Sequence, residues 1–177
     1  MLFIDEPTQV GFSYSEPVPG YTDPNSNYVI TLPNNTCPPY AEDWDCGTYS
    51  YPNLTLTANN TPAAAPNMWK TLQGFMGAFP DYSRDGFYFT TESYGGHYAP
   101  IFNDYFLSQN EKNIEGAHKI DLKAVLIGNG WYDPLVQYEA FYNFSVSPGN
   151  SYDYMPFNAS VRSQFYTNMY GPGNCYE

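Results

Sequence analysis

Residues 86–100 read Gly86-Phe87-Tyr88-Phe89-Thr90-Thr91-Glu92-Ser93-Tyr94-Gly95-Gly96-His97-Tyr98-Ala99-Pro100, and they contain the strongest indication of the fold class. After the first glycine, residues 87–91 are all aromatic or β-branched, a composition typical of a strand. Beyond Pro100, apolar side chains recur at helical spacing and predict an amphipathic helix: Ile101, Phe102, Tyr105 and Phe106. Residues 91–95 therefore lie where a strand meets a helix.

Ser93 is the candidate catalytic residue of this turn. A serine on a tight strand-to-helix turn has its hydroxyl raised at the carboxyl edge of the sheet, and the N–H of the next residue, Tyr94, points to where an oxyanion would form. Gly95 meets the need for a small neighbour, and Gly96 lets the following helix pack closely. The first glycine of the usual motif is replaced here by Thr91. A serine in this position is more often a plain helix N-cap, so the five residues alone leave both interpretations open.

Two further segments predict the fold around the turn. Apolar residues between 65 and 78 recur at steps of three and four and predict a helix that Pro80 ends; they are Met68, Trp69, Leu72, Phe75 and Met76, with Phe79 beyond. Residues 122–127 predict a second, buried strand that ends at Gly128-Asn129-Gly130. After Tyr132 we expect short helices and loops, one helix covering about residues 161–169. This alternation predicts an α/β fold with a parallel sheet and flanking helices.

The N-terminal third is predicted to be less regular. Residues 2–4 are a short apolar run ended by Asp5-Glu6-Pro7, which indicates a buried strand entering a loop. Residues 16–66 are rich in Pro, Asn, Thr and Tyr without a sustained period, so we expect an ordered but irregular insertion. Such a length exceeds an ordinary connection and indicates a functional segment or a surface elaboration.

The composition excludes several classes of protein. The 177 residues suffice for one domain with a sizeable core, and 42% hydrophobic against 14% charged residues argues against disorder. The formal net charge of −12 disfavours nucleic acid and anionic membranes as partners. No apolar stretch reaches transmembrane length. The 19 Tyr and 12 Phe suit either a cleft that grips ligands or a tyrosine-rich surface.

The cysteines and sequons favour the secretory route. Cys37 and Cys46 lie close enough in sequence to form a local disulfide, which leaves Cys175 for a partner outside the chain; three free thiols are the alternative. Five N-x-[ST] sequons are candidate glycosylation sites: Asn34, Asn53, Asn59, Asn143 and Asn158. The N-terminus carries no signal peptide, so we expect upstream residues to be missing and the intact protein to be secreted or vacuolar (lysosome-like).

Three blocks together resemble the serine carboxypeptidase family. Leu2-Phe3-Ile4-Asp5-Glu6-Pro7 through Val10-Gly11-Phe12-Ser13-Tyr14-Ser15 is similar to its aromatic-Ile-Asp-Gln-Pro…Gly-Phe-Ser-Tyr segment. Residues 91–100 resemble its Glu-Ser-Tyr-Gly/Ala-Gly-His-Tyr-x-Pro signature, which in fungal members often follows a Thr. Ile127-Gly128-Asn129-Gly130-Trp131-Tyr132-Asp133-Pro134 resembles its Gly-Asn-Gly…Asp-Pro block. The blocks occur in the family's order.

The resemblance implies a fold and a set of roles. Residues 1–134 would form part of an α/β-hydrolase fold with 16–66 as an enlarged insertion, and 135–177 would begin a helical lid, with Cys175 in one of its disulfides. Ser93 would be the acylated nucleophile and Tyr94 would give an oxyanion-hole N–H. Glu92 would hydrogen-bond the terminal carboxylate of a peptide or protein substrate, which confines cleavage to C-termini. Two carboxyl groups form a close hydrogen bond only when they share a proton. The resemblance therefore also implies peptidase activity that is highest at acidic pH.

Other parts of the family's machinery are not in this sequence. The triad runs Ser, Asp, His, but the chain holds two histidines only: His97, inside the signature where the family's His is structural, and His118, in a polar run typical of a loop. The family's Trp-Asn-Gly-Gly-Pro-Gly segment is absent. We therefore expect an internal piece of an exopeptidase, inactive alone because an unactivated serine is a poor nucleophile. A stand-alone non-catalytic protein and an acyltransferase of the same family are the alternatives.

No cofactor or metal site is predicted. The cysteines and histidines lack the spacing of zinc ligands. A glycine-rich loop of the type that binds phosphate is also missing from the sequence.

Overall fold

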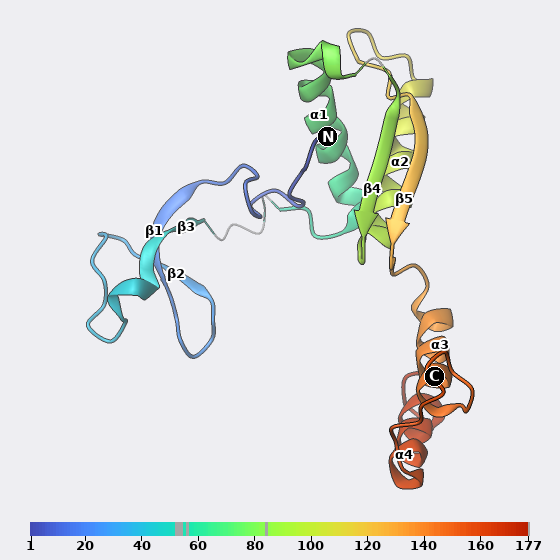
Figure 1. Ribbon diagram of the computed structural model, residues 1–177. Coiled ribbons are helices and arrows are strands. Elements are labelled where there is room, and N and C mark those ends of the chain that lie inside the picture. Colours follow the sequence, from blue (N-terminus) through green and yellow to red (C-terminus); the bar gives the residue numbers. More distant parts are fainter. Residues whose placement is uncertain (52–54, 56, 84, 177) are drawn as a thin grey trace. The chain divides into compact units, whose positions relative to one another are not determined.

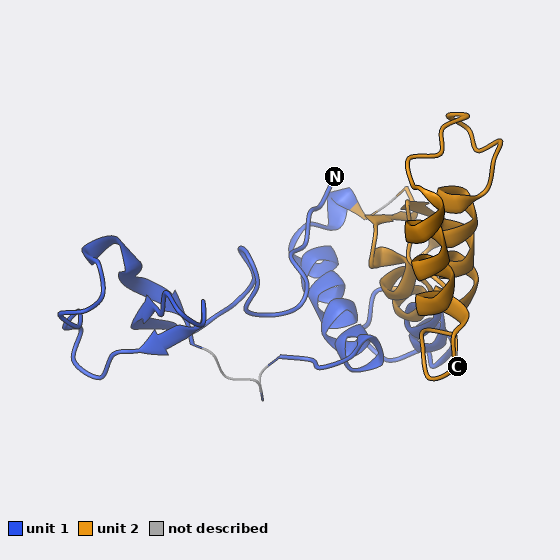
Figure 2. Cartoon of the chain, turned by 90° about the horizontal axis from the view of Figure 1, so that it is seen from below, with its two compact units in different colours: residues 1–82, 104–118 blue, residues 83–103, 119–177 orange. Residues whose placement is uncertain are grey.

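A computed structural model describes residues 1–51, 55, 57–83 and 85–176, and within them the chain is mixed α/β with five strands and four α-helices. It divides into two compact units (Figure 2). The first unit comprises residues 1–82 and 104–118, and the second comprises residues 83–103 and 119–177. In the described part of the chain no helix combines the length and apolar character needed to span a membrane.

A small antiparallel sheet occupies much of the segment 16–66. Strands β1 (Pro17–Thr22), β2 (Val29–Thr31) and β3 (Cys46–Ser50) pair in the order β2-β1-β3. The expectation of an irregular insertion is therefore wrong for this part. The prolines that obscured β1 lie where the strand pairs with β3 alone, because β2 pairs only with residues 20–22. A proline, which lacks an N–H, is tolerated in a strand at such an edge.

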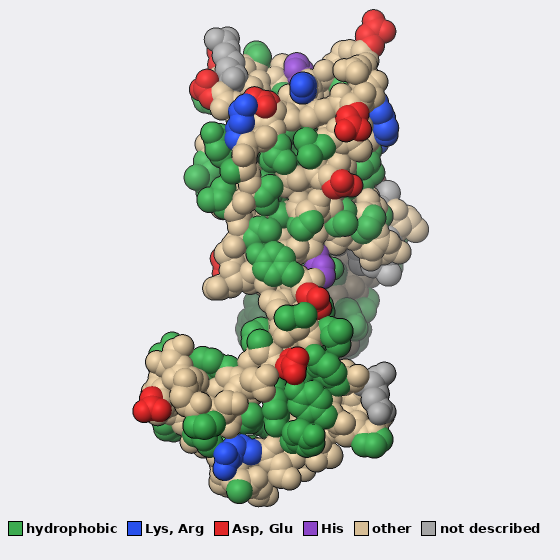
Figure 3. All heavy atoms as spheres, turned by 90° about the vertical axis from the view of Figure 1, so that its right-hand side faces the viewer, with side chains coloured by type: hydrophobic (Ala, Val, Ile, Leu, Met, Phe, Trp, Pro, Cys, Tyr) green, Lys and Arg blue, Asp and Glu red, His purple; other side chains and the backbone are tan. Residues whose placement is uncertain are grey.

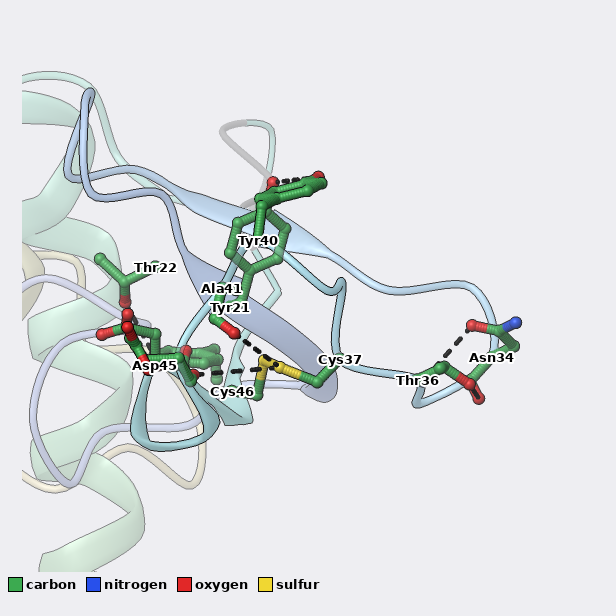
Figure 4. Close-up of a disulfide and its surroundings, with 11 residues drawn as sticks. Tyr21, Thr22, Asn34, Thr36, Cys37, Tyr40, Ala41, Asp45 and Cys46 are labelled. Atoms are coloured by element: carbon green, nitrogen blue, oxygen red, sulfur yellow. Dashed lines mark hydrogen bonds between the residues drawn. A yellow bond between two sulfur atoms is a disulfide. The ribbon is translucent and has the colours of Figure 1, made fainter.

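The predicted local disulfide is present in this sheet. Cys37 and Cys46 are bonded, with their Cα atoms 5.9 Å apart, and tie the segment before β3 to the first residue of that strand (Figure 4). Next to the disulfide, the Tyr21 and Tyr40 hydroxyls lie 3.0 Å apart. This hydrogen bond, together with burial, raises the pKa of Tyr21 to about 12. The disulfide and the tyrosine pair hold together a sheet too small for a core of its own.

The predicted N-terminal strand does not form. Residues 2–4 have no strand conformation, and Phe3 is 84% exposed, because no described segment pairs with them. The following residues form a closed loop instead, in which the Asp5 carboxylate accepts a 2.6 Å hydrogen bond from the Phe12 N–H and the Asp5 carbonyl accepts one from the Ser13 hydroxyl. Glu6 is half-buried beside this loop, and burial raises the pKa of its carboxyl.

Helix α1 (Thr61–Ala78) confirms the helix expected at 65–78 and begins one turn earlier. The Asn60 side chain caps the helix by accepting the Ala63 N–H at 2.9 Å, and Pro62 lies in the first turn. Neither residue belongs to the periodic apolar pattern, so that pattern alone predicts a later start. One face of α1 is buried, made up of Ala64, Ala65, Met68, Leu72 and Met76. The helix ends at Ala78, two residues before Pro80.

The second unit contains a parallel strand pair, β4 (Phe87–Glu92) and β5 (Leu122–Gly128), and the first half of the helix that follows β4, α2 (Gly95–Glu111), whose residues from Asp104 onward belong to the first unit (Figure 1). Both predicted strands and the predicted helix are confirmed, the helix beginning at Gly95. The Phe89 and Phe102 rings contact edge to face, with centroids 6.3 Å apart, and so join β4 to α2.

The predicted burial of β5 is wrong. Leu126 is 52% exposed and Val125 is 39% exposed. In the described structure β4 and β5 pair only with each other. A two-stranded sheet cannot cover both of its faces, so the apolar composition of residues 122–127 does not lead to burial.

Residues after Tyr132 form a helix pair, α3 (Pro134–Val146) and α4 (Ala159–Tyr170). The Asp133 carboxylate and the Asn158 amide oxygen cap their N-termini. The expected helix near 161–169 is thus confirmed. Hydrophobic side chains gather on the surface over this pair (Figure 3). The exposed ones on α3 are Leu135, Val136, Tyr138, Phe141 and Phe144.

The C-terminal residues fold back on α3. The Tyr176 hydroxyl lies 2.7 Å from the Leu135 carbonyl oxygen and 3.2 Å from a Glu139 carboxylate oxygen, and its single proton is shared between these two acceptors. The Tyr170 hydroxyl lies 3.5 Å from the other oxygen of Glu139. Burial and the nearby carboxylate both raise the pKa of Tyr170 and of Tyr176, which keeps the two phenols protonated donors.

Candidate active site

Ser93 lies on the turn between β4 and α2. The strand ends at Glu92 and the helix begins at Gly95, so Ser93 and Tyr94 alone form the connection. Ser93 has φ = 55°, in the left-handed region, and its side chain is exposed. For a residue with a Cβ this conformation costs about 1–2 kcal/mol, and it persists only where the surroundings enforce it. The geometry is that of a sharp, strained turn with the serine at its apex.

Three backbone hydrogen bonds enforce this conformation. The Ser93 N–H donates to the Gly128 carbonyl at 3.1 Å, and the Ser93 carbonyl accepts the N–H groups of Trp131 at 2.8 Å and Gly96 at 3.0 Å. The Ser93 hydroxyl makes no hydrogen bond with any described residue. It therefore does not act as the cap of α2, and the plain N-cap interpretation lacks its defining bond.

Gly95 and Gly96 are both buried and both lie where a side chain would collide. A Cβ at Gly95 would be 2.0 Å from the Thr91 Oγ1 atom. A Cβ at Gly96 would be 2.4 Å from the Trp131 carbonyl oxygen and 2.7 Å from the Trp131 nitrogen. The predicted need for small residues here follows from two different contacts, one with the strand before the turn and one with the loop after β5.

Glu92 and Tyr94 flank the serine. Glu92 is the last residue of β4 and is exposed beside it. The Tyr94 N–H has no hydrogen-bond partner among the described residues, as an oxyanion donor requires before substrate binds. The Tyr94 ring contacts the rings of His97, 5.0 Å between centroids, and Trp131, 5.8 Å between centroids. The turn is therefore flanked by a cluster of packed aromatic rings.

Neither histidine is arranged as a general base. The His97 ring packs edge to face on Trp131, with centroids 5.1 Å apart, and on Tyr94. His118 belongs to the first unit, where its backbone N–H donates to the Gln73 amide oxygen at 2.6 Å and its backbone carbonyl accepts from the Gln73 amide nitrogen at 2.9 Å. Neither imidazole contacts a carboxylate among the described residues, so neither has the partner that orients a triad histidine.

The loop after β5 is the part of the site that sequence reasoning missed. Gln137 on α3 accepts the N–H groups of Tyr132 at 2.8 Å and Asp133 at 3.1 Å, and it donates to the Gly130 carbonyl at 2.9 Å. The loop thus connects Gln137 to Trp131 and from there to the Ser93 carbonyl. The Gly-Asn-Gly motif signalled the end of a strand but gave no sign of this contact.

Among the described residues no group of three or more His, Cys, Asp or Glu side chains could hold a metal ion. Cys175 is exposed and unpaired within the chain. Asn53 lies outside the described residues, and the other four sequon asparagines, Asn34, Asn59, Asn143 and Asn158, are exposed. Exposure is what a glycosylation acceptor requires.

Sequence comparisons with known proteins identify the family of this chain. The family model for serine carboxypeptidases matches residues 43–166. Carboxypeptidase S1 homolog A from Arthroderma otae is 35% identical over 99% of this chain and 28% of its own length. Carboxypeptidase Y homolog A from Sordaria macrospora is 40% identical over 57% of this chain and 17% of its own length. A crystal structure of a prohormone-processing carboxypeptidase from Saccharomyces cerevisiae matches 51% of this chain and 20% of that chain, with 27% identity and a TM-score of 0.42.

The matched family model and the curated relatives define the class of protein, a hydrolase by family. The chain belongs to the serine carboxypeptidase family. It spans 28% of the length of the first of these relatives.

Proposed function

We propose that the chain carries the nucleophile of a serine-type carboxypeptidase and that this nucleophile is Ser93. The strained backbone of Ser93 carries the proposal: a left-handed serine between β4 and α2, with its hydroxyl exposed and free of described partners. A turn that costs free energy is retained where the surrounding structure enforces it, and such positions cluster at active sites.

The proposed reaction proceeds through an acyl-enzyme. The Ser93 Oγ attacks the last peptide carbonyl and gives its proton to a base, and the Tyr94 N–H stabilises the negative oxygen of the tetrahedral intermediate. The C–N bond then breaks, and the base returns the proton to the departing amino acid. Water attacks the ester, gives one proton to the base and releases the shortened peptide, while Ser93 regains its hydrogen.

Glu92 is proposed to select C-terminal residues. It is exposed and directly precedes the nucleophile, so a carboxyl group there can meet the free carboxylate of a peptide end. Two carboxylates repel unless they share a proton, and the shared proton requires acidic conditions. The proposed whole protein therefore acts on peptide and protein C-termini at acidic pH, in a secreted or vacuolar setting that the disulfide and the exposed sequons support.

The surrounding fold is proposed to be a partial α/β-hydrolase core, with the α3–α4 pair beginning a lid. Support comes from the parallel β4–β5 pair, with the serine at the end of β4, and from the helix pair that follows β5. The 177 residues alone are proposed to be inactive as a peptidase, because the His97 imidazole packs on Trp131 and neither imidazole contacts a carboxylate in the described structure.

Fluorophosphonate labelling of the 177-residue chain tests the role of Ser93. We expect the adduct, mapped by mass spectrometry, to form on Ser93 in preference to the other serines, and added imidazole to speed it by acting as the absent base. Ser93→Ala should abolish the adduct, and Ser145→Ala, a matched change at another serine, should leave it unchanged. An adduct spread evenly over many serines, or full labelling of the Ser93→Ala chain, would refute the proposal.

A further inference from the structure

Gln137 makes three hydrogen bonds to backbone groups of one short loop. Its amide oxygen accepts the N–H groups of Tyr132 and Asp133, and its amide nitrogen donates to the Gly130 carbonyl. A side-chain amide has one acceptor and two donors in fixed directions, so three such bonds define the position of the loop closely. These contacts span only four residues of the chain, 130–133, on the side that faces α3.

The side chain of Gln137 is not needed to cap its own helix. The Asp133 carboxylate accepts the Leu135 N–H at 3.0 Å and the Val136 N–H at 3.3 Å, and so caps the start of α3. The backbone N–H of Gln137 makes the ordinary helical bond to the Asp133 carbonyl at 2.9 Å. The amide of Gln137 therefore acts on the loop rather than on the helix.

The loop in turn holds the nucleophile turn. Trp131 lies between the residues that Gln137 binds, and its N–H donates the shortest of the bonds to the Ser93 backbone, 2.8 Å to the Ser93 carbonyl. The Trp131 backbone also limits how closely α2 can approach, since Gly96 packs directly on it. Residue 129, just before this segment, is a left-handed Asn129 with φ = 44°, a conformation that asparagine adopts more readily than most other residues.

We propose that Gln137 is a positioning residue for the nucleophile: its amide fixes residues 130–133 so that the Trp131 N–H holds the Ser93 carbonyl and the left-handed backbone of Ser93. This rests on the proposed function only in naming Ser93 the nucleophile. The geometric part, a clamp acting through Trp131, stands on the contacts alone and is measurable whether or not Ser93 reacts.

Amide hydrogen exchange by NMR on the 177-residue chain measures the clamp directly. In Gln137→Met, which keeps the length of the side chain and removes all three hydrogen bonds, we expect the Trp131 amide to exchange at least about tenfold faster. Amides within β5 should keep their wild-type rates. In Gln137→Glu, which keeps the acceptor for Tyr132 and Asp133 and loses the donor to Gly130, exchange at Trp131 should fall between the two.

Gln164→Met is the matched control. Gln164 is an exposed glutamine on α4 whose amide, among the residues that the structure describes, bonds only Asn168, at 2.9 Å, so the same substitution there should leave the Trp131 amide unchanged. Labelling of Ser93 by the fluorophosphonate is the second measurement. We expect its rate to follow the order wild type, Gln137→Glu, Gln137→Met, from fastest to slowest, and to be unaffected in Gln164→Met.

The outcomes separate this inference from the proposed function. If the Trp131 amide exchanges at the wild-type rate in Gln137→Met, the clamp is wrong even where Ser93 reacts normally. If exchange accelerates as expected and Ser93 never reacts in any form, the proposed function falls and the clamp stands. Should Gln137→Met accelerate every amide through unfolding, Gln137→Glu decides: faster exchange at Trp131 with unchanged β5 amides supports the clamp, and wild-type exchange overturns it.

Discussion

Replacing Gly96 by alanine tests how tightly α2 and the loop after β5 enclose the nucleophile turn. The new methyl carbon would lie 2.4 Å from the Trp131 carbonyl oxygen and 2.7 Å from both the carbonyl carbon and the nitrogen of Trp131. All three atoms belong to the backbone, so no side-chain rotation can relieve the collision. Either α2 must move away or the loop must shift, and the second shift lengthens the 2.8 Å bond from the Trp131 N–H to the Ser93 carbonyl.

The magnitude follows from three contributions. Overpacking a close contact costs about 1–3 kcal/mol. Weakening one backbone hydrogen bond adds about 0.5–1.5 kcal/mol. Alanine favours a helix over glycine by about 0.5–1 kcal/mol, which offsets part of this. The net loss of unfolding free energy is about 1–3 kcal/mol, equivalent to a fall in melting temperature of roughly 3–10 °C for a chain of this size.

Thermal and urea unfolding followed by circular dichroism measure the loss, and two other glycines provide controls. Gly74 lies in α1 with open space around its Cβ position, so Gly74→Ala should raise the stability by about 0.5–1 kcal/mol. Gly128 ends β5, and its nearest neighbour would be the Glu92 Cγ at 3.9 Å, so Gly128→Ala should be tolerated. If Gly96→Ala melts at or above the wild-type temperature, the close packing of helix on loop is wrong.

Three further changes have expected outcomes. Ser93→Gly should be more stable in urea than Ser93→Ala by about 1 kcal/mol, because glycine tolerates φ = 55°; equal stabilities would argue against a strained turn. Burial raises the pKa of Glu6, so its contribution to stability is present at low pH and is lost as the pH rises through the raised value; Glu6→Gln should have the melting temperature of the wild type near pH 3 and a higher one near pH 7, whereas the same difference in melting temperature at both pH values would contradict burial. The Cys37–Cys46 disulfide closes a loop of nine residues, so removing it with Cys37→Ser and Cys46→Ser should destabilise the sheet of β1, β2 and β3 by about 2–3 kcal/mol. The loss is measured as faster amide exchange in those strands, and unchanged exchange would show that the sheet is stable without the disulfide.

The turn at Ser93 could be predicted because its determinants are local. An aromatic and β-branched run, a serine and two glycines follow one another within ten residues, and each has a direct structural consequence there. The contacts that hold the turn are not local: the Ser93 N–H pairs with Gly128 and its carbonyl with Trp131, more than thirty residues further on. The local sequence therefore indicates Ser93 as the nucleophile candidate but does not reveal the backbone contacts with Gly128 and Trp131 that fix its conformation.

The errors in the first unit have a similar cause. A strand exists only where a second strand pairs with it, and nothing in residues 2–4 or 17–22 shows which segment that is. Residues 2–4 are the more apolar and remain unpaired, whereas β1 contains Pro17 and Pro19 and forms the centre of a sheet. The composition of a segment indicates its propensity to form a strand, but it does not identify the segment that pairs with it.

Gln137 was missed for a different reason, because it acts through backbone groups. Its partners are the N–H groups and one carbonyl of residues 130–133, and backbone groups look the same in every sequence. A side chain that hydrogen-bonds to backbone groups produces no sequence motif of spaced residue types, whereas paired carboxylates and metal ligands do. Only its position, four residues after the helix cap at Asp133, distinguishes it from any exposed glutamine.

The described contacts that set the geometry of Ser93 thus lie within residues 87–103 and 119–137, which belong to the second unit. Strand β4 leads into the turn, β5 and Trp131 bind its backbone, and Gln137 holds the loop that contains Trp131. None of these contacts involves a general base. The orientation of the nucleophile and its activation are therefore separable properties, and each can be altered without the other. Substitutions at Gly96 or Gln137 should change where the Ser93 hydroxyl lies, whereas added imidazole should change only how fast a correctly placed hydroxyl reacts.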